Sequence, residues 1–143
     1  MKAEKLNQTD IEFLTSKVKK TTLIYKVAFV SFIVMIPIAV FVAFESGFSW
    51  DTAFLIFAVI ALYLSFHFNK IIVNNIRQDL KNDVKEMSQG TITESFTSYG
   101  KGYIVDEKNY IMDEFEEFEV GEIVLTEYVP ISSTGLRIDK IDK

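Results

Sequence analysis

The chain has 143 residues, which is room for one ordinary domain, and 49% of them are hydrophobic. It contains no cysteine and one histidine, which excludes disulfides, thiolate metal sites, cysteine nucleophiles and His-rich metal centres. Residues 1–78 hold eight Lys/Arg and five Asp/Glu (net +3), whereas residues 79–143 hold seven and fifteen (net −8). So acidic a second half argues against nucleic acid as a partner.

Residues 1–21 are expected to form an amphipathic helix on the cytoplasmic side. Thr9 is followed three residues later by Glu12, which is the spacing of a capping box with Thr9 as N-cap. The apolar residues that follow fall on one helical face, and lysines gather at the C-terminal end. Two placements remain open. The helix lies on the membrane surface, continuous with the next segment, or it docks on the soluble domain.

Two apolar runs predict a transmembrane helical hairpin over residues 22–87. The first run, residues 22–44, has a single charge, Lys26, and would span about 34 Å as a helix. The second, residues 52–68, has no Asp, Glu, Lys or Arg. The first run begins too far into the chain for a cleaved signal peptide, and a second span follows it. An apolar stripe at four-residue spacing predicts that the second helix continues to about residue 87.

The flanks of the hairpin predict its orientation. Gly47 gives backbone freedom to the turn ESGFSWD, in which Ser49 or Asp51 can cap the second helix. The turn has no basic residue, whereas lysine and arginine flank both outer ends. The positive-inside rule therefore puts both termini in the cytoplasm, at an inner (plasma) membrane. The predicted membrane-interface residues are Lys19, Lys20, Lys26, Trp50, Lys70 and Arg77.

Small residues predict where helices meet in the bilayer. Short side chains let helix backbones approach closely in lipid, and a proline within a span removes one helical hydrogen bond. These residues pack the hairpin against itself, or they also pack it against another membrane protein or a further copy. The predicted membrane-packing residues are Ala28, Ser31, Pro37, Ala39, Ala43, Ala58, Ala61 and Ser65.

Residues 88–143 predict an acidic, all-β cytoplasmic domain. Five short runs of β-forming residues are separated by turns of Gly, Asn, Asp and Ser. The run that starts at Glu122 is largely apolar on both faces, which predicts a central strand, and Pro130 ends it. About five short strands favour an OB/SH3-like barrel or a bent meander. So small a core is expected to lean on the preceding helix or on a partner.

The acidic stretch of residues 113–122 is the candidate partner-binding segment. It lacks the spacing and the central glycine of a calcium loop, so we expect a solvated face or a basic partner rather than a metal. The possible partner-binding residues are Asp113, Glu114, Glu116, Glu117 and Glu119. A small-molecule pocket would be sought at Tyr103, Tyr110 and Tyr128. No serine has an activating group at a recognisable spacing, so we expect no catalytic residue and no cofactor.

The order of parts in residues 22–143 resembles that of two groups of bacterial two-span proteins with a small cytoplasmic β domain. One is the NfeD-like proteins, and the resemblance implies an OB-type barrel. The other is the two-span β-barrel effectors of cyclic-nucleotide antiphage systems, and it implies nucleotide sensing in the barrel and assembly in the membrane. The resemblance is one of architecture, without a shared residue motif, and therefore transfers no site.

Two functions remain open from the sequence. The first is a non-enzymatic inner-membrane accessory or scaffold subunit that docks a partner through its hairpin or its acidic β domain. The alternative is a ligand-sensing membrane effector that oligomerises when the β domain binds a small molecule. Both expect the lipid bilayer as an environment, and both expect another membrane protein or further copies of the chain as partners.

Overall fold

The computed structural model describes residues 2–47, 49–96, 101–106, 108–112 and 118–141. The chain divides into two compact units. We call residues 15–74 the hairpin unit, and residues 1–14 together with 75–143 the β unit. The two long helices, α1 (Gln8–Ser46) and α2 (Trp50–Asn82), each contribute to both units. The two long apolar helices followed by a small β domain agree with the predicted order of parts.

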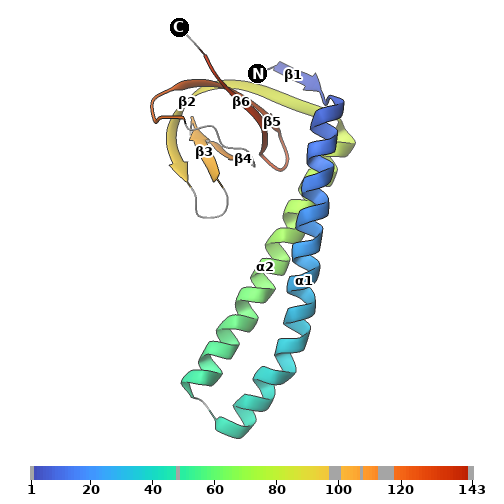
Figure 1. Ribbon diagram of the computed structural model, residues 1–143, viewed down its shortest axis with the longest axis vertical. Coiled ribbons are helices and arrows are strands. Elements are labelled where there is room, and N and C mark those ends of the chain that lie inside the picture. The colour runs from blue at the N-terminus through green and yellow to red at the C-terminus, as the bar shows by residue number, and fades with distance from the viewer. Residues whose placement is uncertain (1, 48, 97–100, 107, 113–117, 142–143) are drawn as a thin grey trace. The chain divides into compact units, whose positions relative to one another are not determined.

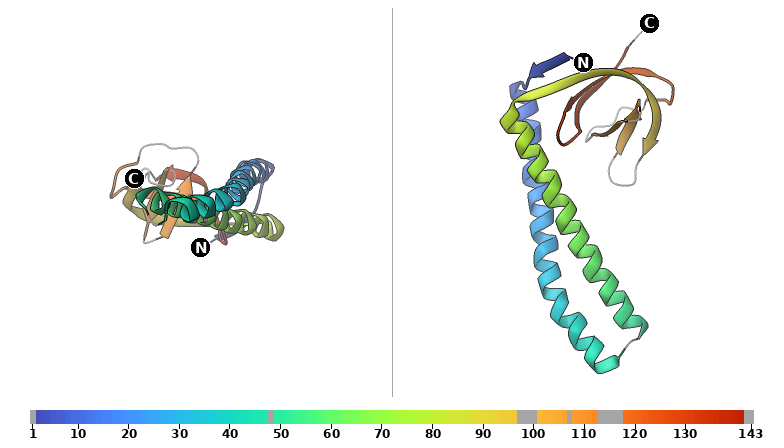
Figure 2. Two further views of the ribbon diagram at one scale, coloured as in Figure 1. Left: turned by 90° about the horizontal axis from the view of Figure 1, so that it is seen from below. Right: turned by 180° about the vertical axis from the view of Figure 1, so that it is seen from behind.

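In the hairpin unit α1 and α2 run side by side in opposite directions (Figures 1 and 2). Aromatic side chains join them in the part of the hairpin that is away from the tip turn. The ring of Phe66 lies 6.1 Å from that of Tyr25 and 5.1 Å from that of Phe29, between ring centroids. Farther along, Phe32 and Tyr63 are 5.8 Å apart. Tilted and edge-on ring pairs of this kind add to the packing that apolar burial alone provides.

The turn at the tip of the hairpin follows the predicted chemistry. Gly47 has a φ of 62°, in the left-handed region that favours glycine. Ser49 is the N-cap of α2, because its Oγ accepts the backbone N–H of Thr52 at 3.3 Å. The hydroxyl of Thr52 in turn donates to the carbonyl of Gly47 at 2.9 Å. These bonds fix the reversal between the helices.

The start of α1 differs from the prediction. The N-cap is Asn7, not Thr9, which lies inside the helix. The side-chain oxygen of Asn7 accepts the N–H of Asp10 at 2.8 Å, and the carboxylate of Asp10 accepts the N–H of Asn7 at 3.0 Å. This reciprocal pair satisfies two free donors two residues upstream of the predicted cap. A strand, β1 (Lys2–Lys5), precedes it and was not predicted.

The end of α2 is the second correction. The helix ends at Asn82, and the expected continuation to about residue 87 is wrong, because β2 (Val84–Phe96) begins there. Asp83 between them has a φ of 56°, which breaks the helix. Its carbonyl accepts the N–H of Leu6 at 3.4 Å, next to the pairing of β1 with β2. The four-residue spacing of apolar residues thus continues to Val84, which is the first residue of a strand and not part of the helix.

Six strands form one bent sheet in the β unit. After β2 come β3 (Lys101–Val105), β4 (Lys108–Met112), β5 (Ile123–Val129) and β6 (Thr134–Lys140). The order is β1-β2-β3-β4-β6-β5, with a further pairing of β2 with β5. All pairings are antiparallel except one parallel residue pair that joins β4 to β6.

The long, strongly curved β2 organises this sheet (Figure 1). Its residues 84–87 pair with β1, residues 86–91 with β5, and residues 92–96 with β3. The prediction that the strand after Glu122 is central is confirmed, because β5 has β2 on one edge and β6 on the other. All five predicted strand segments contribute to the sheet, and β1 is the additional strand.

One buried cluster forms the core of the β unit. It comprises Ile92, Tyr103, Val105, Val124, Tyr128 and Ile138, with Phe118 packed against it. Gly90 in β2 allows a close approach at the edge of this core. A Cβ at Gly90 would lie 2.5 Å from Oδ2 of Asp106 and 2.6 Å from Cγ1 of Val105. Only glycine fits there without movement of the neighbouring chain.

Candidate functional site

The most unusual surface of the molecule is the apolar exterior of the hairpin unit. The structure contains two helices that are long and apolar enough to cross a membrane. Only 11% and 6% of their most apolar 18-residue windows are buried. Large side chains are exposed along both helices, including Leu23, Val27, Phe41, Phe44, Trp50, Phe54, Phe57 and Phe68. A contiguous exposed apolar surface of this extent is typical of contact with lipid or with another protein.

The predicted membrane-packing residues fall into two groups. Ala28 and Ala39 on α1 are buried within the chain. Ala43 near the tip of α1 and Ala61 on α2 are exposed, as is Pro37, through which α1 continues without a break. The remaining members are half-buried: Ser31, Ala58 and Ser65. The exposed alanines therefore remain accessible to another helix, which is the arrangement that one of the two sequence hypotheses requires.

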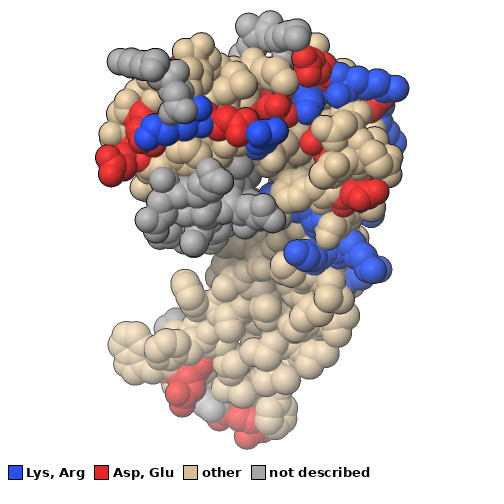
Figure 3. All heavy atoms as spheres, turned by 45° about the horizontal axis from the view of Figure 1, so that its top comes forward, with Lys and Arg blue, Asp and Glu red and all other residues tan. Residues whose placement is uncertain are grey.

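Charge is separated along the hairpin unit. Its acids are Glu45 and Asp51, both exposed and both at the tip. Its cations lie toward the end of the unit that is away from the tip: Lys17, Lys19, Lys20, Lys26 and Lys70. Figure 3 shows the resulting pattern, with red atoms at the tip and an uncharged surface above them. Along its length, the hairpin unit is thus acidic at the tip, apolar in the middle and basic at the end opposite the tip.

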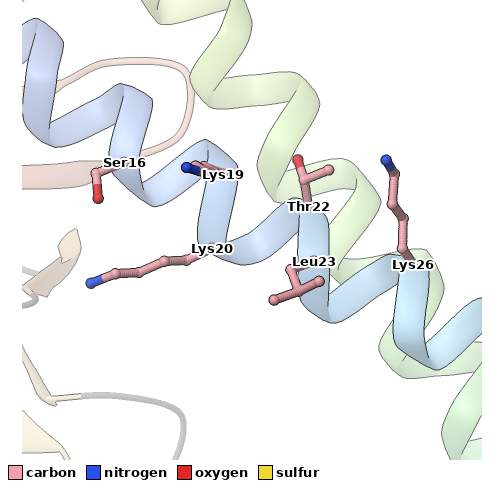
Figure 4. A pocket seen from close by; sticks show the side chains of 6 residues that line it. All are labelled: Ser16, Lys19, Lys20, Thr22, Leu23 and Lys26. Atoms are coloured by element: carbon pink, nitrogen blue, oxygen red, sulfur yellow. The ribbon is translucent and has the colours of Figure 1, made fainter.

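A shallow hollow of about 530 Å³ lies at the basic end of α1 (Figure 4). All the residues that line it come from α1: Ser16, Lys19, Lys20, Thr22, Leu23 and Lys26. Lys20 and Leu23 project to one side of the helix, and Thr22 and Lys26 to the other. The Thr22 hydroxyl is enclosed and has no hydrogen-bond partner among the described residues. The polar groups that a ligand can reach therefore include the lysine ammonium groups and the hydroxyl of the exposed Ser16.

The other predicted interface residues all lie on α2. Trp50 is the first residue of α2 and is 85% exposed. The Nζ of Lys70 lies 5.7 Å from the centroid of the Phe66 ring, a cation–π distance. Arg77 is exposed on the part of α2 that belongs to the β unit. His67 is exposed as well, and its ring is stacked with that of Tyr63 at 6.0 Å.

Within the β unit, Asp79 of α2 holds the turn between β5 and β6. Its side chain is fully buried. One carboxylate oxygen accepts the N–H of Ile131 at 2.9 Å, and the other accepts the N–H of Ser132 at 2.8 Å. Two charge-assisted bonds in a buried place compensate the desolvation of this carboxylate. The last part of α2 is in this way fixed to the sheet.

Lys85 of β2 holds the start of α1 in a similar way. It is buried, and its Nζ lies 3.1 Å from Oδ2 of Asp10 and 2.6 Å from Oε2 of Glu127. Burial lowers the pKa of Lys85, but the hydrogen bonds to Glu127 and Asp10 outweigh burial, so the pKa is raised above its usual value. The ion triad joins α1, β2 and β5.

Sequence reasoning did not single out Asp79 or Lys85. Asp79 lies three residues after the buried Ile76, so it shares the apolar face of α2. A charged residue on an apolar face indicates a buried partner, and this was the available signal. Lys85 offered no comparable signal, because it stands in a segment whose helical interpretation was wrong.

Two of the three tyrosines at which a small-molecule pocket was predicted, Tyr103 and Tyr128, are packed in the core of the β unit. Tyr103 is buried, and its hydroxyl accepts the N–H of Phe118 at 3.1 Å. Tyr128 is also buried and donates to Oε2 of Glu86 at 2.7 Å. The side chain of Tyr110 lies outside the described residues. Both described rings belong to the buried core of the β unit.

The structure describes only residues 118–122 of the acidic stretch that was predicted to bind a partner. Asp113, Glu114, Glu116 and Glu117 lie outside the described residues. Glu119 is exposed, and its N–H donates to the carboxylate of Glu122 at 3.1 Å.

Glu122 is the acid of this segment that has a cation partner in the described structure. Its carboxylate also pairs with the ammonium of Lys140. The hydrogen bond from Lys140, together with that from the Glu119 backbone, lowers the pKa of Glu122. The segment is thus joined to β6 at its C-terminal end.

No protein-family model, no curated protein and no solved structure matches this chain.

Proposed function

We propose that the chain is a non-enzymatic, multi-pass protein of the inner (plasma) membrane that acts as an accessory or scaffold subunit. The observation that carries the proposal is the exposed apolar exterior of the hairpin, whose most apolar windows are 11% and 6% buried. In water such a surface would aggregate, whereas in a bilayer it is the stable arrangement. The α-helical hairpin satisfies its own backbone hydrogen bonds, as a lipid-embedded segment must.

The charge order supports a topology in which both termini are cytoplasmic. The lysine-rich end of the hairpin unit stays on the cytoplasmic side, and the acidic tip with Glu45 and Asp51 crosses to the other side. Trp50, exposed at the first residue of α2, suits the interface on that far side. The β unit, which holds residues 1–14 and 75–143, is then cytoplasmic.

The β unit supports the scaffold part of the proposal. Asp79 fixes the end of α2 to the β5–β6 turn, and Lys85 fixes the start of α1 to β2 and β5. Each of the two helices is therefore held by a buried charged residue at the end that belongs to the β unit. We further propose that the β2–β5 and β4–β6 pairings close the sheet into a small barrel. Partners would dock on the acidic segment around Glu119 or on the exposed alanines of the hairpin.

The ligand-sensing effector remains the alternative. It requires a small-molecule pocket in the β unit, and the two described tyrosines proposed for it are both engaged in the core. We therefore place the accessory or scaffold function first.

The membrane topology can be tested by single-cysteine labelling, because the chain has no native cysteine. Glu45→Cys at the tip and Ser95→Cys in β2 replace exposed residues. In intact cells, a membrane-impermeant maleimide should label the first variant and leave the second unlabelled until the cells are lysed. Both variants should stay with the membrane after alkaline carbonate extraction. Release by carbonate would refute the anchor, and inverted labelling would refute the orientation.

The scaffold function is tested by purification from native membranes in mild detergent followed by native mass spectrometry. A second protein at fixed stoichiometry is the expected result. Alanine-to-leucine changes at Ala43 and Ala61 should then weaken its retention if it docks on the hairpin, while carbonate resistance stays unchanged. A homo-oligomer that retains a small molecule would instead favour the effector.

A further inference from the structure

We propose that the basic hollow on α1 binds the phosphate of an anionic lipid headgroup. The proposal rests on the proposed function, since it requires the hairpin to lie in a bilayer, and it adds a specific lipid class as a partner. Three exposed lysines, Lys19, Lys20 and Lys26, line the hollow within about two turns of helix.

No described residue of the chain forms a counter-ion for these three ammonium groups. None of them forms an ion pair within the part of the chain that the structure describes. The only acids of the hairpin unit, Glu45 and Asp51, stand at its tip, and no acid occurs from Phe13 to Phe44. A cluster of exposed cations without an acid beside it in the described part of the chain attracts anions from the surroundings.

The surface next to the hollow indicates that this anion carries an apolar tail. Leu23, which lines the hollow, is 64% exposed. Val27 and Val30, one and two turns farther along α1, are 57% and 62% exposed. Lys20, Leu23 and Val27 are spaced by three and four residues and therefore lie on the same helical face. A phospholipid has both groups that this face can bind, a phosphate for Lys20 and an acyl chain for Leu23 and Val27. A free phosphate ion would contact the lysine and leave the aliphatic side chains uncovered.

The location agrees with the physics of lysines at a membrane surface. The long stem of lysine can lie along apolar surface while its ammonium group reaches the headgroup layer. Lys26 lies at the apolar side of the cluster, nearest the middle of the helix, and has the reach for this. Clusters of basic residues beside a membrane-crossing helix attract anionic lipids by an amount that grows with each added charge.

The test compares lipid retention by native mass spectrometry of the full chain released from detergent micelles. The micelles contain equal amounts of phosphatidylglycerol and phosphatidylcholine with the same acyl chains. The wild-type chain should retain phosphatidylglycerol in preference. The variant K19Q/K20Q/K26Q should lose this preference by about tenfold or more, and K19R/K20R/K26R should keep it, since arginine preserves the charge. The matched control K5Q/R137Q/K140Q removes three exposed cations of the β unit that neither line the hollow nor flank a membrane-crossing segment, and it should retain the wild-type preference.

Several results would overturn the proposal. No preference in the wild type, or equal losses in the two glutamine variants, would show that the hollow has no special role. Displacement of the lipid by millimolar inorganic phosphate would show that the site recognises a free anion rather than a lipid. Failure of the proposed function is seen separately, as release of the chain by alkaline carbonate, whereas these lipid ratios are measured in micelles and do not depend on that extraction.

Discussion

Replacement of Asp79 by alanine should destabilise the β unit strongly. The carboxylate accepts the N–H groups of Ile131 and Ser132 at 2.9 and 2.8 Å, and its side chain is fully buried. The Asp79→Ala variant leaves two partly buried donors without their acceptor, at a cost of about 1–3 kcal/mol for each. The free energy of unfolding should therefore fall by roughly 2–6 kcal/mol, which is a large share of the ~5–15 kcal/mol of an ordinary domain.

Hydrogen–deuterium exchange of the full chain in detergent micelles gives the measurement. Peptides that cover β5, the turn at Ile131 and Ser132, and β6 should exchange faster in Asp79→Ala, while peptides from the middle of the hairpin should be unchanged. Asp79→Asn keeps one carbonyl acceptor and should lie between the two. Asp139→Asn is the matched control, because this aspartate pairs with Arg137 on the surface of β6 and its side chain is 42% exposed.

The control should change the free energy of unfolding by no more than ~0.5 kcal/mol. The reasoning would be refuted by an Asp79→Ala variant that exchanges like the wild type around Ser132, because the carboxylate would then not be the acceptor that holds this turn.

Three further predictions concern the β unit. Lys85→Met leaves the carboxylates of Asp10 and Glu127 buried without a cation and should cost about 3–5 kcal/mol in urea unfolding; since the pKa of Lys85 is raised, the wild-type advantage is fully present below pH ~10.5 and fades as pH rises through the folded-state pKa. Gly90→Ala places a Cβ 2.5 Å from a carboxylate oxygen and should lower the urea midpoint by an amount equivalent to about 1–3 kcal/mol; an unchanged midpoint would contradict the close approach. Glu122 has a lowered pKa, so Glu122→Gln should be less stable than the wild type above pH ~4.5, and acid titration followed by circular dichroism should show the two converge as pH falls through the folded-state pKa.

Much of the fold was accessible from local patterns in the sequence. The two long helices follow from apolar runs that are long enough to cross a bilayer as helices. Gly47 and Ser49 were identified in the tip turn because their roles depend only on neighbouring residues. The five strand segments were identified by alternation and turn residues for the same reason. The separation of lysines from acids along the hairpin, which gives the candidate lipid site its charge, is likewise a property of residue order.

Tertiary structure decided what local patterns leave ambiguous. After Asn82, Val84 continues the four-residue apolar spacing of α2, which favours a helix, and only the pairing of this segment with β1 and β5 selects the strand. The short β1 has no stability by itself and exists because β2 offers an edge. Asp79 and Lys85 became anchors only when residues about 50 and 42 positions away arrived beside them. A buried charge is stable only with its distant partners in place, so such sites are properties of the folded chain and not of any segment.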